Sequence, residues 1–283
     1  MLTGHCHDTG VSAAETLRNE EVLASGERVI HVALAGQPNV GKSTIFNLLT
    51  GLNQHVGNWP GKTVERKVGT YRHNGRLYQL TDLPGTYSLT ANSEEERIAR
   101  DFILQERPDV VVAVVDAAIL ERSLYLLAEL LVLPQPVVLA LNMVDVARQR
   151  GMEIEPHVLE AALGVPVVPM VASRGQGVRE LMDVVEKVAT EGLPCPPSRP
   201  TIREDHQAVL REIRNLIHGA VPSPYPEDWV ALKLLEGDEE VTALVREHLG
   251  PTRWEEVHRL LMQHEDAVLA VAGARYDWIR RMV

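Results

Sequence analysis

The segment at residues 36–43 constrains this chain more than any other, because it reads G-Q-P-N-V-G-K-S and has the spacing G-x-x-x-x-G-K-[ST]. It follows a largely apolar run at residues 31–35, typical of a buried strand, and the apolar periodicity of a helix comes after it. This context turns backbone N–H groups and the positive end of a helix toward phosphates. We therefore expect a nucleotide phosphate cradle made by Gly36, Asn39, Val40, Gly41, Lys42, Ser43 and Thr44.

Two side chains of this cradle are expected to contact the phosphates and the metal ion directly. Lys42 is expected to reach the β- and γ-phosphates as a point charge, and the hydroxyl of Ser43 is expected to ligate Mg²⁺. The alternative is a glycine-rich turn that merely contains Lys and Ser. The strand before the segment and the helix after it argue against that alternative.

A D-x-x-G pattern, Asp82 to Gly85, follows a second apolar strand. Asp82 is expected to hold Mg²⁺ through water, and the Gly85 N–H to sense the γ-phosphate. Between the two motifs, residues 57–63 show neither helical nor strand periodicity, which predicts a mobile switch loop whose Thr63 hydroxyl reaches Mg²⁺ when GTP is bound. We expect Lys42, Thr63 and Gly85 to serve hydrolysis. Thr86 stands where many GTPases carry a water-orienting Gln, so we expect slow hydrolysis.

The pattern N-x-x-D, Asn142 to Asp145, ends another apolar strand and selects the base. An Asp carboxylate accepts two parallel hydrogen bonds from guanine, whereas adenine offers no such donor pair. Asn142 is expected to tie this loop to the cradle, and Met143 to cover one face of the base. Backbone N–H groups of a later turn are expected to meet the guanine O6, and they belong to Val171, Ala172 and Ser173.

The segments G-Q-P-N-V-G-K-S, V-G-N-W-P-G-K-T-V-E, T-D-L-P-G-T-Y-S-L and L-N-M-V-D together resemble the cytosolic amino-terminal region of the ferrous iron transport protein B family. The resemblance implies a soluble GTPase part at the cytoplasmic side of the bacterial inner membrane, followed by a helical domain that steadies GDP and then by a membrane domain. Some members of the family are accelerated by K⁺. The resemblance implies that Asn39 and the carbonyls of Gly57 and Trp59 would coordinate that ion.

Strand and helix signals alternate up to a proline-rich stretch, which favours an α/β fold with a doubly wound, mostly parallel sheet of the P-loop GTPase kind and a smaller all-α carboxyl-terminal domain. The expected divisions are a flexible tail at 1–28, a G domain at 29–193, a linker at 194–201 and a helical domain at 202–283. Residues 67–73 and 77–80, joined by Asn74-Gly75, predict the single antiparallel pairing of the sheet. Residues 267–283 show no stop signal, so we expect the missing membrane domain to follow them.

Local patterns add three smaller expectations. Capping-box spacing places helix starts at Ser93 and at Thr252. Trp59 is expected to be either an aromatic anchor of a resting loop or an apolar side chain partly exposed on a mobile one. The run His5-Cys6-His7 could wrap a metal, although we favour a simple flexible tail.

Composition excludes several classes of protein. A net charge of −11 without a basic stripe argues against nucleic acid as a partner. No run approaches the roughly 18 apolar residues of a membrane-spanning helix. The sequence leaves homo-oligomer formation open. Two other hypotheses also stay open: a free-standing GTPase of the RNA-assembly type, disfavoured by a carboxyl-terminal part with more acidic than basic side chains, and a nucleotide-switch adaptor with low turnover.

Overall fold

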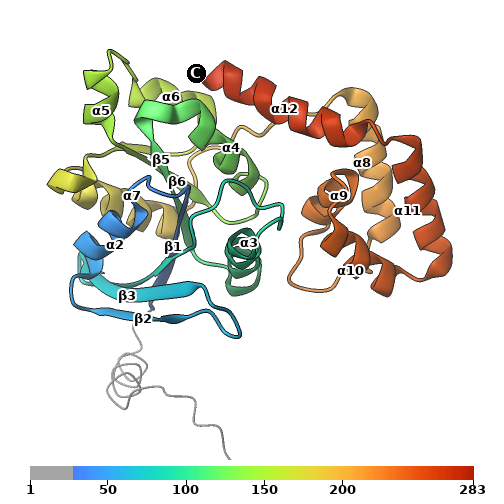
Figure 1. Ribbon diagram of the computed structural model, residues 1–283, viewed down its shortest axis with the longest axis horizontal. Helices are drawn as coiled ribbons and strands as arrows, with labels where there is room; N and C mark the ends of the chain where they lie inside the picture. Colours follow the sequence, from blue (N-terminus) through green and yellow to red (C-terminus); the bar gives the residue numbers. More distant parts are fainter. Residues whose placement is uncertain (1–27) are drawn as a thin grey trace, which may run out of the picture.

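A seven-stranded sheet with helices on both faces forms the first part of the computed structural model, which describes residues 28–283 (Figure 1). Most of the tail expected at 1–28, including His5, Cys6 and His7, lies outside the described residues. The strands are β1 (Ile30–Gly36), β2 (Gln54–Asn58), β3 (Glu65–His73), β4 (Arg76–Asp82), β5 (Val110–Asp116), β6 (Val137–Asn142) and β7 (Val167–Pro169).

The strands lie in the order β2-β3-β4-β1-β5-β6-β7. β1 pairs in parallel with β4 and β5, and β6 pairs in parallel with β5 and β7. β3 and β4 form the expected antiparallel hairpin across Asn74 and Gly75. The carboxyl ends of the parallel strands therefore meet at one edge, where an open α/β sheet binds its ligands.

The sequence expectation was wrong at β2, because the sheet contains a second antiparallel pairing. β2 pairs with β3, so Gly57 and Asn58 end a strand opposite Arg66 and Glu65 instead of belonging to an irregular loop. Exposed β2 has little apolar alternation to reveal it, and the free edge of β3 supplies its hydrogen bonds. Strand formation depends here on the neighbouring strand more than on local propensity.

Alternate side chains of β1 show how the two faces of the sheet are covered. Val32 and Leu34 pack into the cluster that includes α2 (Lys42–Thr50) and α7 (Val178–Glu191). Ala33 and Ala35 face the other cluster, which includes residues of α3 (Glu94–Glu106) and α4 (Leu120–Leu130). Burial on both faces explains why the parallel strands read as continuous apolar runs.

Of the two helix starts predicted from capping-box spacing, the structure confirms one. The Ser93 hydroxyl caps α3 by accepting a hydrogen bond from the N–H of Glu96, as expected. The start predicted at Thr252 is wrong, because the N-cap of α11 (Pro251–Gln263) is Gly250, two residues earlier. Proline suits the first helical position, since its φ is fixed near the helical value and it has no N–H to leave unpaired.

The remainder of the chain is helical. Here α8 (Glu204–Ile217), α9 (Glu227–Leu235), α10 (Glu239–Leu249) and α11 lie beside the sheet-bearing part, and α12 (Ala267–Met282) runs back against α4 and α6 (Pro156–Leu163) (Figure 1). The indole N–H of buried Trp278 on α12 donates to the Ser198 hydroxyl at 3.1 Å, which fastens α12 to the proline-rich segment. Across residues 28–283, no helix is both long and apolar enough to cross a bilayer.

Candidate functional site: a nucleotide cradle at the carboxyl edge of the sheet

Two glycines of the segment at residues 36–43 leave no room for a side chain. A Cβ on Gly36 would lie 2.5 Å from the carbonyl oxygen of Val114 on β5. A Cβ on Gly41, whose φ is +95°, would lie 2.3 Å from Nδ2 of Asn142. Val40 is buried between them, whereas Asn39, with a φ of +66°, is exposed. The chain thus turns tightly at the end of β1, with Pro38 and Asn39 exposed at the turn.

The start of α2 brings three of the predicted residues together. Lys42 is buried, and the Ser43 hydroxyl donates to Oδ2 of Asp82 at 3.0 Å. Burial lowers the pKa of Lys42, and it raises the pKa of Asp82. Each charge partly offsets the cost of burying the other. Thr44 is exposed on the next position of the helix.

The donor set at Ser43 and Asp82 fits a magnesium ion. Oδ1 of Asp82 is buried and has no hydrogen-bond partner among the described residues. A buried carboxylate oxygen without a partner is costly unless water or a cation reaches it. Mg²⁺ takes oxygen ligands of this kind and usually keeps several waters, so a hydroxyl and a carboxylate side by side suit it.

The D-x-x-G segment packs directly on the cradle. A Cβ on Gly85 would lie 3.1 Å from both N and Cα of Pro38, so a side chain here would require Pro38 to shift by a few tenths of an ångström. The Thr86 N–H donates to the carbonyl of Gly36 at 3.2 Å, and its side chain is buried. Movement of this segment would therefore change its contacts with Gly36 and Pro38 of the cradle.

Asn142 joins three loops at the same edge. Its amide nitrogen donates to the carbonyl of Val40 at 2.9 Å, and its amide oxygen accepts from the N–H of Ala172 at 3.0 Å. Both bonds are buried, so losing either would leave a polar backbone group unpaired. The cradle, the N-x-x-D loop and the turn containing Val171, Ala172 and Ser173 are thereby held in one arrangement.

The predicted base-reading residues line this arrangement. Met143 is half-buried with a φ of +62°, and it precedes α5 (Val144–Gln149). The Asp145 carboxylate accepts from the N–H of Val146 at 3.0 Å, and its other oxygen lies 3.7 Å from Nη2 of Arg174. These are modest contacts on a partly exposed carboxylate. They leave acceptor capacity for a pair of donors from outside the chain.

The structure does not bring the Thr63 hydroxyl into contact with the predicted magnesium ligands. Thr63 is exposed, and among the described residues its side chain makes no hydrogen bond to Ser43 or Asp82. Gly57 lies in edge strand β2, and the carbonyl of Trp59 accepts the Lys62 N–H at 2.9 Å. Coordination of K⁺ by Asn39 and by the carbonyls of Gly57 and Trp59 stays a prediction.

Trp59 anchors its loop. The side chain is only 8% exposed, and its ring meets that of Phe102 on α3 edge-on at 5.5 Å. The guanidinium of Arg66 lies 5.0 Å from the ring centroid. Of the two interpretations of this residue, burial favours the anchor, because an apolar partner on α3 and a cation cover the ring.

A buried set of charges, which sequence reasoning missed, connects the segment after D-x-x-G with the helical part. Glu129 on α4 accepts from the Leu89 N–H, and Arg275 on α12 lies 3.3 Å from Glu129 and also pairs with Glu236. Burial raises the pKa of Glu129 despite the positive charges of Lys233 and Arg275. The signal in the sequence was one acid, Glu129, within the otherwise apolar stretch at residues 124–131.

A second ionic contact joins α3 to the start of α10. Buried Arg100 lies 3.5 Å from Asp238 and 2.5 Å from Glu240, while Arg97 reaches Glu240 at 2.6 Å. Together with Glu129, these pairs tie both helices that follow the D-x-x-G segment to the helical part.

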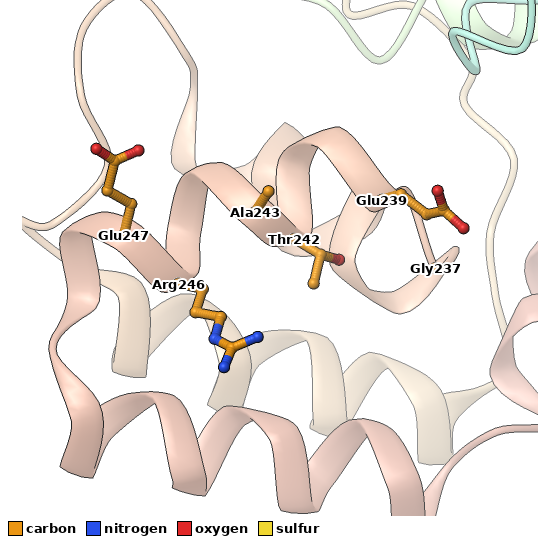
Figure 2. A pocket seen from close by; sticks show the side chains of 6 residues that line it. All are labelled: Gly237, Glu239, Thr242, Ala243, Arg246 and Glu247. Carbon is orange, nitrogen blue, oxygen red and sulfur yellow. The ribbon is translucent and has the colours of Figure 1, made fainter.

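A hollow of about 700 Å³ lies along α10, away from all these motifs. Figure 2 shows Arg246 and Glu247 directed to opposite sides of the helix, with Glu239 near its other end. Since its polar groups do not converge, this hollow offers no alternative functional site.

Comparisons with known proteins agree with this geometry. A family model described as ferrous iron transport protein B matches residues 30–185, and one described as the FeoB cytosolic helical domain matches residues 204–283. The Fe(2+) transporter FeoB of Shigella flexneri is 40% identical over 259 residues, which are 88% of this chain and 32% of that protein. A Fe(2+) transport protein A/Fe(2+) transporter FeoB fusion protein of Porphyromonas gingivalis is 42% identical over 232 residues, which are 80% of this chain and 27% of that protein.

Solved structures show the same fold. The cytosolic domain of the T. maritima FeoB iron transporter in GDP form II matches with a TM-score of 0.80 and 35% identity, covering 90% of this chain and 98% of that one. The cytosolic domain of L. pneumophila FeoB matches with a TM-score of 0.77 and 35% identity, covering 89% and 97%. The chain spans about a third of the length of the curated relatives it matches.

Proposed function

Because this chain belongs to the ferrous iron transport protein B family, we propose that it is the GTP-binding and GTP-hydrolysing control part of a bacterial transporter for Fe²⁺. The observation that carries the nucleotide part of the proposal is the double hydrogen bond of Asn142 to Val40 and Ala172. It holds a phosphate cradle and a base-reading loop at the edge where such sheets bind nucleotides.

Each residue then has a chemical task. The backbone N–H groups of residues 39–44 and the positive end of α2 hold the phosphates, and the Lys42 ammonium stabilises negative charge between the β- and γ-phosphates. Ser43 and Asp82 would hold Mg²⁺, which supplies further positive charge to the transferring phosphoryl group when bound. Asp145 selects guanine by accepting its paired donors.

Hydrolysis is proposed to be slow and to depend on movement of the switch segments. Thr63 has to leave its exposed position to approach Ser43, and Gly85 already lies against Pro38 of the cradle. Thr86 is buried and has no side-chain amide with which to orient water. Acceleration by K⁺ stays a prediction, which equal turnover in K⁺ and Na⁺ would contradict.

The helical part is proposed to steady bound GDP through the segment that follows D-x-x-G. Support comes from the buried contacts of Glu129 with Leu89 and Arg275, and from the pairs that Arg100 makes with Asp238 and Glu240. A membrane domain of the full-length protein would be the partner that receives the nucleotide state. We place this part on the cytoplasmic side of the bacterial inner membrane.

The two other hypotheses have less support. A free-standing GTPase for RNA assembly has no matching feature in the carboxyl-terminal part, which instead matches a FeoB helical domain. A low-turnover adaptor would keep the same nucleotide site, so steady-state phosphate release separates it from an enzyme. A homo-oligomer would be detected by sedimentation of the full chain.

Uptake by the full-length protein tests the transport proposal. Vesicles containing it, loaded with GTP and Mg²⁺, should accumulate Fe²⁺, and Lys42→Ala and Asp145→Asn should both reduce that uptake. Lys187→Ala, which removes an exposed lysine of α7 outside the nucleotide site, is the matched control. Uptake that is unchanged by both cradle variants would contradict control by this part.

A further inference from the structure

We propose that His206, His264 and Asp266 form a binding site for one divalent transition-metal ion, between the first turn of α8 and the turn that joins α11 to α12. Each residue offers one ligand atom, and these atoms all lie within 4.8 Å of one another. The cluster belongs to the helical part and shares no residue with the nucleotide cradle. The inference therefore does not depend on the proposed function.

The spacing of the donors suits a shared ion. Nε2 of His206 lies 3.4 Å from Oδ2 of Asp266. Two ligands bound at about 2.1 Å with a tetrahedral angle are about 3.4 Å apart, so this pair already has the required separation. The rings of His206 and His264 face each other nearly edge-on, with centroids 6.1 Å apart. His264 needs only a side-chain adjustment of about 1–2 Å to complete the set.

The burial and the contacts of His206 supply an independent argument. Its ring is 1% exposed, and each ring nitrogen faces a carboxylate: Nε2 faces Asp266, and Nδ1 lies 3.5 Å from Oδ1 of Asp205. Nδ1 is nevertheless buried without a hydrogen bond. A metal on Nε2, with Nδ1–H directed at Asp205, is the arrangement usual for metal-binding histidines.

The surroundings of the cluster define the class of ion. Two imidazoles and one carboxylate suit Zn²⁺, Fe²⁺ or Co²⁺, whereas Mg²⁺ and Ca²⁺ prefer oxygen ligands alone. Three protein ligands leave further positions for water. The positive charge of Arg203 competes with a metal ion for these carboxylates. Its Nη2 lies 3.4 Å from Oδ2 of Asp266 and 3.1 Å from Oδ2 of Asp205. The Arg203 side chain is 65% exposed, so an entering ion can displace it into solvent.

Titration of the full, nucleotide-free chain with Co²⁺ and Zn²⁺ tests the site. Because His5, Cys6 and His7 offer other ligands, the titration is repeated in a variant with all three replaced by Ala. That variant should still bind one equivalent, with a visible Co²⁺ absorption band and a higher unfolding temperature. In the same background, His264→Ala and the isosteric Asp266→Asn should each weaken binding about tenfold or more.

Two further variants distinguish metal binding at this cluster from a purely structural effect of the substitutions. Arg203→Gln should tighten binding because it removes the competing charge, a change of sign that a purely structural role would not produce. His258→Ala, at an exposed histidine that stacks on Trp254, should leave binding unchanged. The unfolding temperature without metal shows whether each variant is folded. Binding lost with the tail ligands, or binding equal in the parent, His264→Ala and Asp266→Asn proteins, would overturn the inference.

Discussion

The side-chain amide of Asn142 occupies the space that a Cβ on Gly41 would need, since the two would be only 2.3 Å apart. The same amide holds Val40 and Ala172, so the fit between Gly41 and Asn142 fixes the distance between phosphate cradle and base loop. The sequence motif explains Gly41 by the close approach of the backbone to a phosphate. The structure adds a second reason, because Gly41 also leaves room for the side chain of Asn142.

Gly41→Ala should therefore weaken GDP binding about tenfold or more, because Asn142 has to move and its two buried hydrogen bonds are disturbed. Gly151→Ala is the matched control, since Gly151 also has a positive φ but a Cβ there would meet nothing within 4 Å. In both variants the backbone conformation costs about 1–2 kcal/mol. Calorimetric titration with GDP should separate them, and equal affinities would show that the link made by Asn142 does not determine GDP affinity.

Asp145→Asn should reduce GDP affinity by about 2–4 kcal/mol, because an amide cannot accept both guanine donors. Xanthosine diphosphate carries a carbonyl in place of the exocyclic amine and should gain relative to GDP. Titration calorimetry with both nucleotides checks this exchange. An unchanged GDP affinity would mean that Asp145 does not read the base.

An element of this structure can be predicted when its own residues determine it, and cannot be when it depends on residues far along the chain. β1, β5 and β6 were predictable because parallel strands buried on both faces are apolar throughout. The contact between Asn142 and the cradle was predictable because the motifs fix which strand ends meet. Strand β2 was not, since its pairing with β3 depends on a distant free edge.

The features that the sequence left open or did not show have the same physical origin. Burial of Trp59 requires Phe102 on α3, and burial of Glu129 requires Arg275, which is far along the chain. A charged residue within an apolar helix is a visible signal of a buried partner, but the sequence does not say which residue that partner is. The approach of His264 and Asp266 to His206 likewise appears only when α8 and α12 are placed.

Thr63→Ala should lower GTP hydrolysis much more than GDP binding. Thr63 is exposed and makes no hydrogen bond to Ser43 or Asp82 among the described residues, so its loss should change GDP binding little. Its hydroxyl acts only once the switch loop closes on GTP and Mg²⁺. Single-turnover phosphate release and GDP titration measure the two effects, and equal losses in both would point to a folding defect.

The pKa of Asp82 predicts how Mg²⁺ binding varies with pH. Burial raises this pKa above the ordinary value of 3.8, against the opposing charge of Lys42 and the hydrogen bond from Ser43. The folded protein thus holds the proton more tightly than the unfolded chain does. The resulting stabilisation is present below pH 3.8 and is lost as the pH rises toward the folded-state pKa.

Mg²⁺ requires the ionised carboxylate, so the affinity of the GDP-bound protein for Mg²⁺ should rise with pH across that interval, and binding should release a proton there. Calorimetry in buffers of different ionisation enthalpy counts the proton. Asp82→Asn should lack this step, and a step of the same size in that variant would assign the proton to another group.

The most direct test of the account is steady-state phosphate release by the full chain with GTP or ATP, in the presence of Mg²⁺ and K⁺. We expect slow but repeated turnover of GTP, no turnover of ATP, and loss of GTP turnover in Lys42→Ala, because Lys42 is the buried cation of the cradle. Equal turnover of both nucleotides, or GTP turnover that persists in Lys42→Ala, would contradict the account.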